Sequence, residues 1–405
     1  MGLNVWITRL ATGRPHVLIV EMPGYSVLRM RLEAGITARG WVLAQAPAEA
    51  DVLLVCGEAQ PPYPEVIEAI WNQIPGPRCR ASVTAADAIP AALDAIPAQL
   101  GDRNAQLADA TLRPKPSDAG TADDETTDAP GDETSTGHAA HQHQGDHDHS
   151  GMQHEMHGEC PEHEGHTEHA DADMDDMDMD MSHMHMDMSG PAGIPLASGD
   201  ENDRDGLEMD IIHLSLGPVL PSWPAGLVVR CTLHGDVIAE ATIEVVPPAV
   251  SNASTPAEPP APVPRAVELC DASAHLLAVA GWEPVAGKIR RLRDDLLEDL
   301  RPVDTVIAGL DSAADRVARS RTLRWSLRGV PELRDVDALS RLLGWLHTAS
   351  ELLAHGPVLS DDFEGPFTLD EVRQALTGQE LATARLVIAS IGPARIGHLV
   401  GPDHG

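Results

Sequence analysis

The sequence predicts two folded regions of different class, an α/β domain and then an α+β domain, joined by a disordered acidic linker. From His16 onward, short apolar runs alternate with helix-like segments. Residues 101–200 hold 24 acidic and 3 basic residues but no Trp, Tyr or Phe, so they lack the apolar bulk that a core requires. Apolar periodicity returns near residue 206. The predicted boundaries are 1–102, 103–204, 205–250 and 251–405.

The α/β domain, 1–102, is expected to hold a small parallel sheet covered by helices. The strand-like runs are 16–21, 41–45, 51–56 and 78–83. The helix-like segments are 25–39, one that begins at Pro64, and 85–100. Since continuous apolar strands alternate with helices, the strands should be parallel and buried on both faces.

The α+β region is expected to begin with strands and continue as helices. The strand-like runs are 209–216, 227–233 and 237–246, the last two joined by a short turn that contains Gly235, which is typical of a hairpin. A mainly helical domain over 251–405 follows, with helices predicted at 266–281, 285–300, 303–319 and 335–355. Thr368 and Glu371 form a capping-box pattern that starts one more helix.

Composition excludes several classes of protein. The formal net charge is -35 and no basic stripe is interleaved with aromatic residues, so we expect no nucleic-acid partner. No apolar run approaches the roughly 20 residues of a membrane span, so we expect no direct membrane insertion. Residues 1–10 lack the pattern of a secretory leader and the five cysteines are scattered, which predicts a reducing, cytoplasmic location.

The linker carries residue types that bind metal ions. Imidazoles at short spacing, interleaved with carboxylates, can converge on nickel, copper or zinc, and thioethers favour Cu(I). The candidate ligands in the first part are His138, His141, His143, His147, His149, His154, His157, Cys160, His163, His166 and His169. Those in the second part are Met174, Met177, Met179, Met181, His183, Met184, His185, Met186 and Met188.

Two interpretations of this segment stay open. In one, the segment binds copper or nickel, or zinc, as a selected function. In the other, it is a solvated acidic linker whose His and Met bind metal only adventitiously. Because a disordered site loses chain entropy on binding, we expect several weak to moderate sites rather than one rigid centre.

Several motifs point to a family. The first region contains DVLLVCG at 51–57, PEVIEAI at 64–70 and IPGPR at 74–78, and it resembles the flavodoxin-like small subunit shared by respiratory complex I and [NiFe] hydrogenases. The second contains LGPVLP at 216–221, AGLVVR at 225–230 and LHGDVI at 233–238, and it resembles the N-terminal β-hairpin of the large partner subunit. The resemblance implies a flavodoxin-like fold for 1–102 and a degenerate fusion of both subunits.

The residues that carry the chemistry of this family are missing. The small subunit binds a [4Fe-4S] cluster through cysteines, but the loops at 23–26 and 83–86 read PGYS and VTAA. The hydrogenase large subunit holds nickel with two Cys-x-x-Cys pairs, and no two cysteines here are that close. Complex I has a histidine after the Gly-Pro where this chain has Val219. We therefore expect no Fe-S cluster, and we interpret Cys56 and Cys79 as buried strand residues.

The leading hypothesis is a non-catalytic accessory, assembly or metal-delivery subunit whose partners are hydrogenase or complex I-like subunits. It would be cytoplasmic and peripheral to a membrane complex. One alternative is a structural subunit of a working NADH:quinone oxidoreductase-like or hydrogenase-like electron-transfer complex, and another is a free-standing copper or nickel buffer.

One further motif is the arginine cluster at 316–328. It is compatible with docking of an acidic partner or of the chain's own acidic linker, although a solvated helix face is the interpretation we favour.

Overall fold

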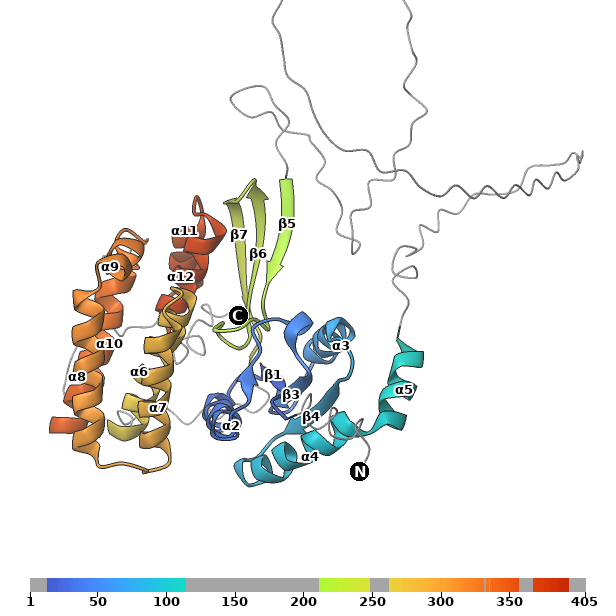
Figure 1. Ribbon diagram of the computed structural model, residues 1–405. Coiled ribbons are helices and arrows are strands. Elements are labelled where there is room, and N and C mark those ends of the chain that lie inside the picture. Colours follow the sequence, from blue (N-terminus) through green and yellow to red (C-terminus); the bar gives the residue numbers. More distant parts are fainter. Residues whose placement is uncertain are drawn as a thin grey trace, which may run out of the picture. The chain divides into compact units, whose positions relative to one another are not determined.

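The computed structural model describes residues 13–113, 211–247, 262–330, 333–334, 336–356 and 367–392. The chain divides into two compact units, Met1–Pro116 with Leu196–Gly405, and Ser117–Pro195. All described residues belong to the first unit (Figure 1).

A four-stranded parallel sheet forms the centre of the N-terminal region. Its strands are β1 (His16–Glu21), β2 (Val42–Leu43), β3 (Val52–Cys56) and β4 (Cys79–Val83). They lie in the order β2-β1-β3-β4, and every neighbouring pair is parallel. All five residues of β3 are buried, as expected for a central parallel strand that is covered on both faces. The prediction of a parallel α/β region is confirmed.

Helices cover both faces of this sheet (Figure 1). The helices are α2 (Ser26–Ala38), α3 (Tyr63–Gln73) and α4 (Ile89–Gly101), with short 3-10 turns at Pro47–Glu49 and Ala86–Ala88. One core joins α2 and α4 to one face through fully buried Leu32 and Leu93. The other core joins α3 to the opposite face, where Ile67 packs with Leu53. The apolar strand residues are therefore divided between two cores.

A further helix, α5 (Arg103–Leu112), continues the ordered region into the range predicted as linker. The carboxylate of Asp102 caps it by accepting hydrogen bonds from the backbone N–H groups of Asn104 and Ala105. Asp109 accepts two hydrogen bonds from the guanidinium of Arg78, at 3.0 and 2.9 Å. These contacts hold α5 against the sheet region, so the boundary predicted at 102 lies too early.

The C-terminal region begins with a three-stranded antiparallel sheet. Its strands are β5 (Ile211–Leu216), β6 (Leu227–His234) and β7 (Val237–Val245), in that order. Gly235 has a φ of +64° in the tight turn between β6 and β7, which explains why glycine stands there. The hairpin predicted at this turn is confirmed.

The described remainder of this region is helical. The helices are α6 (Pro262–Val279), α7 (Glu283–Leu297), α8 (Val303–Arg319), α9 (Arg321–Leu327), α10 (Ala338–His355), α11 (Leu369–Leu376) and α12 (Leu381–Ile391). The capping box of Thr368 and Glu371 is present at α11. Helices α9 and α12 were not predicted. Ser320 separates α8 from α9 and caps α9, because its hydroxyl accepts a hydrogen bond from the N–H of Leu323.

Helix α2 packs in two directions. Its Leu32 belongs to the core beneath the parallel sheet, whereas its Met30, 1% exposed, belongs to the core of the C-terminal helices. Helix α2 therefore contributes to both regions and contacts α7. Within the part of the chain that the structure describes, none of the helices combines the length and apolar character that crossing a bilayer requires.

The loop after β3 allows a test of this packing. Gly57 has a φ of +106°, and a Cβ there would lie 2.5 Å from Cδ2 of Tyr25. Gly40 also has a positive φ, +70°, but a Cβ there would meet nothing within 4 Å. We predict that Gly40→Ala lowers the free energy of unfolding by about 1 kcal/mol and Gly57→Ala by about 3 kcal/mol. Urea denaturation of both variants measures the difference, and equal losses would contradict the close packing on Tyr25.

Candidate functional site

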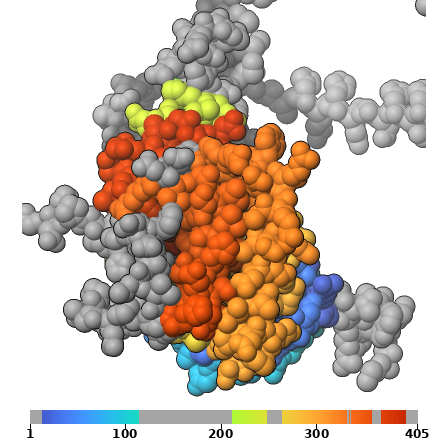
Figure 2. All heavy atoms as spheres, turned by 90° about the vertical axis from the view of Figure 1, so that its left-hand side faces the viewer, coloured from blue at the N-terminus to red at the C-terminus, as the bar shows by residue number. Residues whose placement is uncertain are grey.

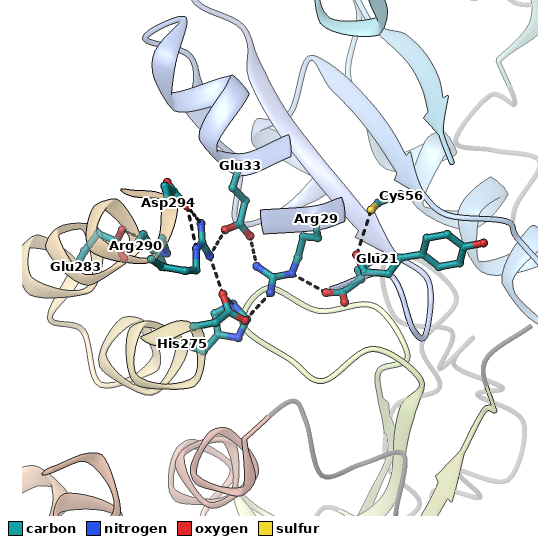
Figure 3. A network of polar contacts seen from close by, with 11 residues as sticks. Glu21, Arg29, Glu33, Cys56, His275, Glu283, Arg290 and Asp294 are labelled. Carbon is teal, nitrogen blue, oxygen red and sulfur yellow. Dashed lines mark hydrogen bonds and ion pairs between the residues drawn. The ribbon is translucent and has the colours of Figure 1, made fainter. Parts of the chain in front are cut away.

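A group of buried charged side chains lies where α2 and the end of β1 meet α6 and α7 (Figure 3). We call it the buried ion network. It consists of Glu21, Arg29, Glu33, Asp271, His275, Arg293 and Asp294. Asp271 and Arg293 are completely buried, which is rare for charged side chains unless they are paired.

Arg29 occupies the centre of the network. Its Nε donates to Oε2 of Glu21 at 2.7 Å, its Nη1 to Oε1 of Glu33 at 2.6 Å, and its Nη2 to Oδ2 of Asp271 at 2.5 Å. These acceptors come from β1, α2 and α6, so one guanidinium joins three elements. The contact with Asp271 spans 242 positions of the sequence.

Arg293 of α7 completes the network from the other side. Its Nη1 donates to Glu33 Oε2 at 2.8 Å and to Asp271 Oδ1 at 2.6 Å. Its Nε and Nη2 both donate to Oδ1 of Asp294. Glu33 and Asp271 therefore each bridge the two arginines, and every carboxylate in this group has a charged donor. Buried charges are tolerated in this form because each is paired and hydrogen-bonded.

The two bridging carboxylates stay ionised. Burial alone would raise the pKa of Glu33, but the positive charges of Arg29 and Arg293 outweigh it and lower the pKa to about 2. The pKa of Asp271 is likewise lowered, because Arg29, His275 and Arg293 together outweigh its burial.

Glu21 and His275 behave differently because burial dominates. Burial raises the pKa of Glu21 to about 7, and its contact with Arg29 offsets this only in part. Burial lowers the pKa of His275 to about 4, although Asp271 opposes the change. His275 Nε2 lies 3.9 Å from Asp271 Oδ1, which is too far for a hydrogen bond. At neutral pH the site therefore contains a neutral imidazole and a carboxyl group that can still hold a proton.

A cavity of about 90 Å³ opens beside these two groups. Strand β2 pairs with β1 only as far as Val17, so among the described residues the rest of β1 has no strand partner on that side. Residues of the segment between β5 and β6, together with residues of β1, line the cavity. The polar lining includes Glu21, His275 and Arg290, and the apolar lining includes Leu18, Leu43, Val219, Leu220 and Trp223. The space is large enough for several water molecules and lets Glu21 exchange a proton.

The metal-ligand residues predicted in the segment 138–188 all lie outside the described residues. Of the five cysteines, Cys160 is in that segment and four are described. Cys56 and Cys79 lie in β3 and β4, buried, as predicted. Cys56 is at the carboxyl end of its strand and Cys79 at the amino end of the neighbouring one, so the two do not converge.

The described thiols are poorly suited to bind metal. Burial raises the pKa of Cys79 to about 12, with a smaller effect of Asp51. Burial likewise raises the pKa of Cys270 to about 12, and the pKa values of Cys56 and Cys231 are also raised by burial. Because their pKa values are raised, these groups are neutral thiols at physiological pH. A metal ligand must be a thiolate. Among the described residues, no three His, Cys, Asp or Glu side chains are placed together to hold a metal ion.

Comparison with known proteins gives no relative. No family model, no curated protein and no solved structure matches the chain.

The buried ion network was not predicted from the sequence. Arg29 and Glu33 are four residues apart on a predicted helix, a pattern that usually indicates a solvated pair. A usable signal was present in α6, where Asp271 is the one acidic residue between Leu269 and Ala280 and most of its neighbours are apolar. An acid among apolar helix residues indicates a buried partner, but the sequence does not say which.

The network predicts unequal effects for two arginines of the same helix. Arg29→Ala leaves three buried carboxylates without this donor and should lower the free energy of unfolding by about 3–5 kcal/mol. Arg31 also joins α2 to the residue that follows α7, Glu298, at 2.8 Å, but its side chain is 37% exposed. Arg31→Ala should cost less than about 1 kcal/mol. Denaturation of both variants in urea tests this, and similar losses would show that burial of the network does not matter.

The pKa values of Glu21 and His275 predict opposite pH dependences. The raised pKa of Glu21 stabilises the folded state below pH 4.5, and this contribution is lost as the pH rises to about 7. The lowered pKa of His275 does the reverse, so its contribution is present above pH 6.5 and is lost as the pH falls to about 4. In the unmodified chain, the contributions of Glu21 and His275 to the free energy of unfolding largely cancel between about pH 4 and pH 7.

Single variants should reveal each effect. With Glu21→Gln, the free energy of unfolding should rise by about 3 kcal/mol between pH 4 and 6.5, because the opposing titration of Glu21 no longer masks that of His275. With His275→Gln it should fall by about 3 kcal/mol between pH 4.5 and 7. Urea denaturation at a series of pH values measures both slopes, and slopes of the same sign would contradict the assignment.

Proposed function

We propose that this chain is a non-catalytic accessory or assembly subunit related to complex I and [NiFe] hydrogenases, with a segment that binds copper or nickel. The proposal rests on one observation: the His, Met and Cys side chains that could bind metal are concentrated in one segment. Residues 138–188 contain twelve His, nine Met and Cys160. The four described cysteines are instead buried on β3, β4, β6 and α6.

The arrangement of the parallel sheet supports the family relation. The order β2-β1-β3-β4, with helices on both faces, is the order of the first four strands in flavodoxin-like folds. In the C-terminal region an antiparallel hairpin precedes a set of helices, which agrees with the resemblance to the large subunit.

The buried ion network supports a scaffold role. Arg29 and Glu33 belong to the region that resembles the small subunit, and Asp271 and Arg293 to the region that resembles the large one. Their contacts hold the two regions in one arrangement within a single chain. Since the nearby thiols are neutral and separate, the folded part would serve as a platform and the segment 138–188 would carry the ions.

The chemistry of the segment suits exchangeable ions. Imidazole and carboxylate ligands accept nickel, Cu(II) or zinc, and the methionines from Met174 to Met188 favour Cu(I). Ligands of this kind, spread along a chain, bind several ions weakly enough to pass them to a partner. The metal is therefore cargo in this proposal, and not a resident cofactor.

The cavity favours one second candidate, a structural subunit of a working electron-transfer complex. Glu21 holds a proton near neutral pH beside the neutral His275, which is suited to proton exchange with a partner bound at that edge. In this case clusters would be supplied by other chains.

Elemental analysis tests the proposal. Anaerobically purified full-length chain should contain copper or nickel, and a variant lacking 138–188 should contain neither. Two matched variants separate the ligands, one with the histidines of 138–169 replaced by glutamine and one with the methionines of 174–188 replaced by leucine. We predict that the first loses nickel and Cu(II), whereas the second loses Cu(I) only.

Iron and the folded part provide the controls. Circular dichroism should show unchanged helix content in the deletion variant. Iron with inorganic sulfide that persists after the deletion would overturn the proposal, because it would place a cluster on the folded part. Copper or nickel that persists would place the site elsewhere in the chain.

A further inference from the structure

Helices α8 and α9 present a group of exposed cationic and aromatic side chains that the function proposed above does not use. We call it the arginine–tryptophan surface. It consists of Arg316, Arg319, Arg321, Arg324, Trp325 and Arg328, all of which are exposed. No acidic residue occurs between positions 316 and 328, although the chain as a whole has 63 acidic residues. Figure 2 shows the side of the molecule on which α8 lies, in orange.

The spacing of these residues places them on one face of α9. Arg321, Arg324 and Arg328 are three and four positions apart, so they lie side by side on the helix. Leu323 and Leu327 occupy the opposite face and are buried. Trp325 is 83% exposed and lines a hollow together with the three arginines. A second hollow, lined by Arg316, Arg319 and Trp282, lies at the end of α8 just before it.

Four of the five guanidinium groups have no partner among the described residues. Arg319 pairs with Asp315, whereas no ion pair or hydrogen bond joins the side chains of Arg316, Arg321, Arg324 or Arg328 to the described part of the chain. Arg29 and Arg293 show the opposite arrangement, because each of their guanidinium nitrogens donates to a carboxylate inside the protein. Several unpaired cations beside a tryptophan are therefore free to bind an anionic group.

We propose that the arginine–tryptophan surface binds an acidic peptide segment of a partner protein. The planar guanidinium fork matches the two oxygens of a carboxylate, and the exposed indole offers an apolar contact next to it. Arg and Trp are also the residue types that dominate binding energy at protein interfaces. This inference does not depend on metal binding by the segment 138–188.

The charge of the chain favours a peptide over an extended polyanion. A nucleic acid or an anionic membrane carries its charge over a wide surface, and beyond the arginines it would meet a protein of net charge -35. A peptide is narrow enough to contact only the two hollows. Its carboxylates can reach the arginines while its apolar side chains lie against Trp325.

Fluorescence anisotropy tests the proposal. The probe is a fluorescein-labelled peptide of consecutive glutamates that flank one leucine, and its control has glutamine in place of each glutamate. The glutamate peptide should bind the full chain, with an affinity that falls as salt rises, and the glutamine peptide should not. The double variant Arg321→Gln, Arg324→Gln should bind at least about tenfold more weakly, and Trp325→Ala should also weaken binding.

Matched controls lie elsewhere on the surface. Arg103→Gln removes an exposed arginine of α5, and Leu300→Ala removes an apolar side chain that is 67% exposed. Neither should change the affinity by more than about twofold, as expected for substitutions outside the site. Residues 138–188 contain 14 acidic residues and no Lys or Arg, so this segment could compete with the probe. The titration is therefore repeated on the variant lacking 138–188.

Three results would overturn the proposal. The first is no binding of the glutamate peptide to either the full chain or the deletion variant. The second is an equal loss of binding in the control variants. The third is tighter binding of oligo-deoxythymidine, or of phosphatidylcholine vesicles that contain phosphatidylglycerol, with the same dependence on Arg321 and Arg324, because it would assign the surface to a nucleic acid or a membrane.

Discussion

The described structure depends on the buried ion pair between Arg29 and Asp271, 2.5 Å apart and almost inaccessible to water. A charge in such a place is tolerated only when its partner is present, so α2 and α6 cannot separate without exposing or isolating both groups. Arg293 extends the same constraint to α7 through Glu33 and Asp271. Because α2 also packs beneath the parallel sheet, these contacts fix how the helices meet the sheet.

A network of this kind contributes more to the uniqueness of the arrangement than to its net stability. Desolvation of the charges offsets much of their attraction, and apolar residues of similar size would pack with less cost. Apolar contacts are less directional, because an apolar side chain can pack against many apolar neighbours. Arg29 of α2 must meet Glu21 of β1 and Asp271 of α6 at once, so the position of α2 is tied to two other elements.

The same network explains why Glu21 differs from Glu33. The two arginines share Glu33 and Asp271, so these carboxylates are held between two positive charges. Glu21 contacts Arg29 alone and lies near the negative charges of Asp271 and Glu33. Glu21, the less compensated of the two, therefore lies beside the cavity, where a proton can enter and leave. Proton affinity at this edge is a consequence of how the network divides its charges.

The sequence allowed the local elements to be predicted, but not the contacts between distant ones. Continuous apolar runs identified β1 and β3, because a strand buried on both faces has few other compositions. Helix α5 has a local cap in Asp102, but it was missed because its contact with the sheet region depends on Arg78, which lies far away in the sequence. The link from Arg29 to Asp271 was missed for the same reason. Patterns of three or four residues report a helix face, whereas an ion pair across 242 positions leaves no local pattern.

Arginine has two opposite roles in this chain, one in the buried ion network and one in the arginine–tryptophan surface on α8 and α9. Buried Arg29 needs its partners within the protein, and they are present. Exposed Arg324 is solvated by water, so the fold does not require a partner for it. Folding alone therefore does not account for several such arginines gathered around an exposed tryptophan in an acidic chain. Their concentration is expected if the ligand that neutralises them comes from another molecule.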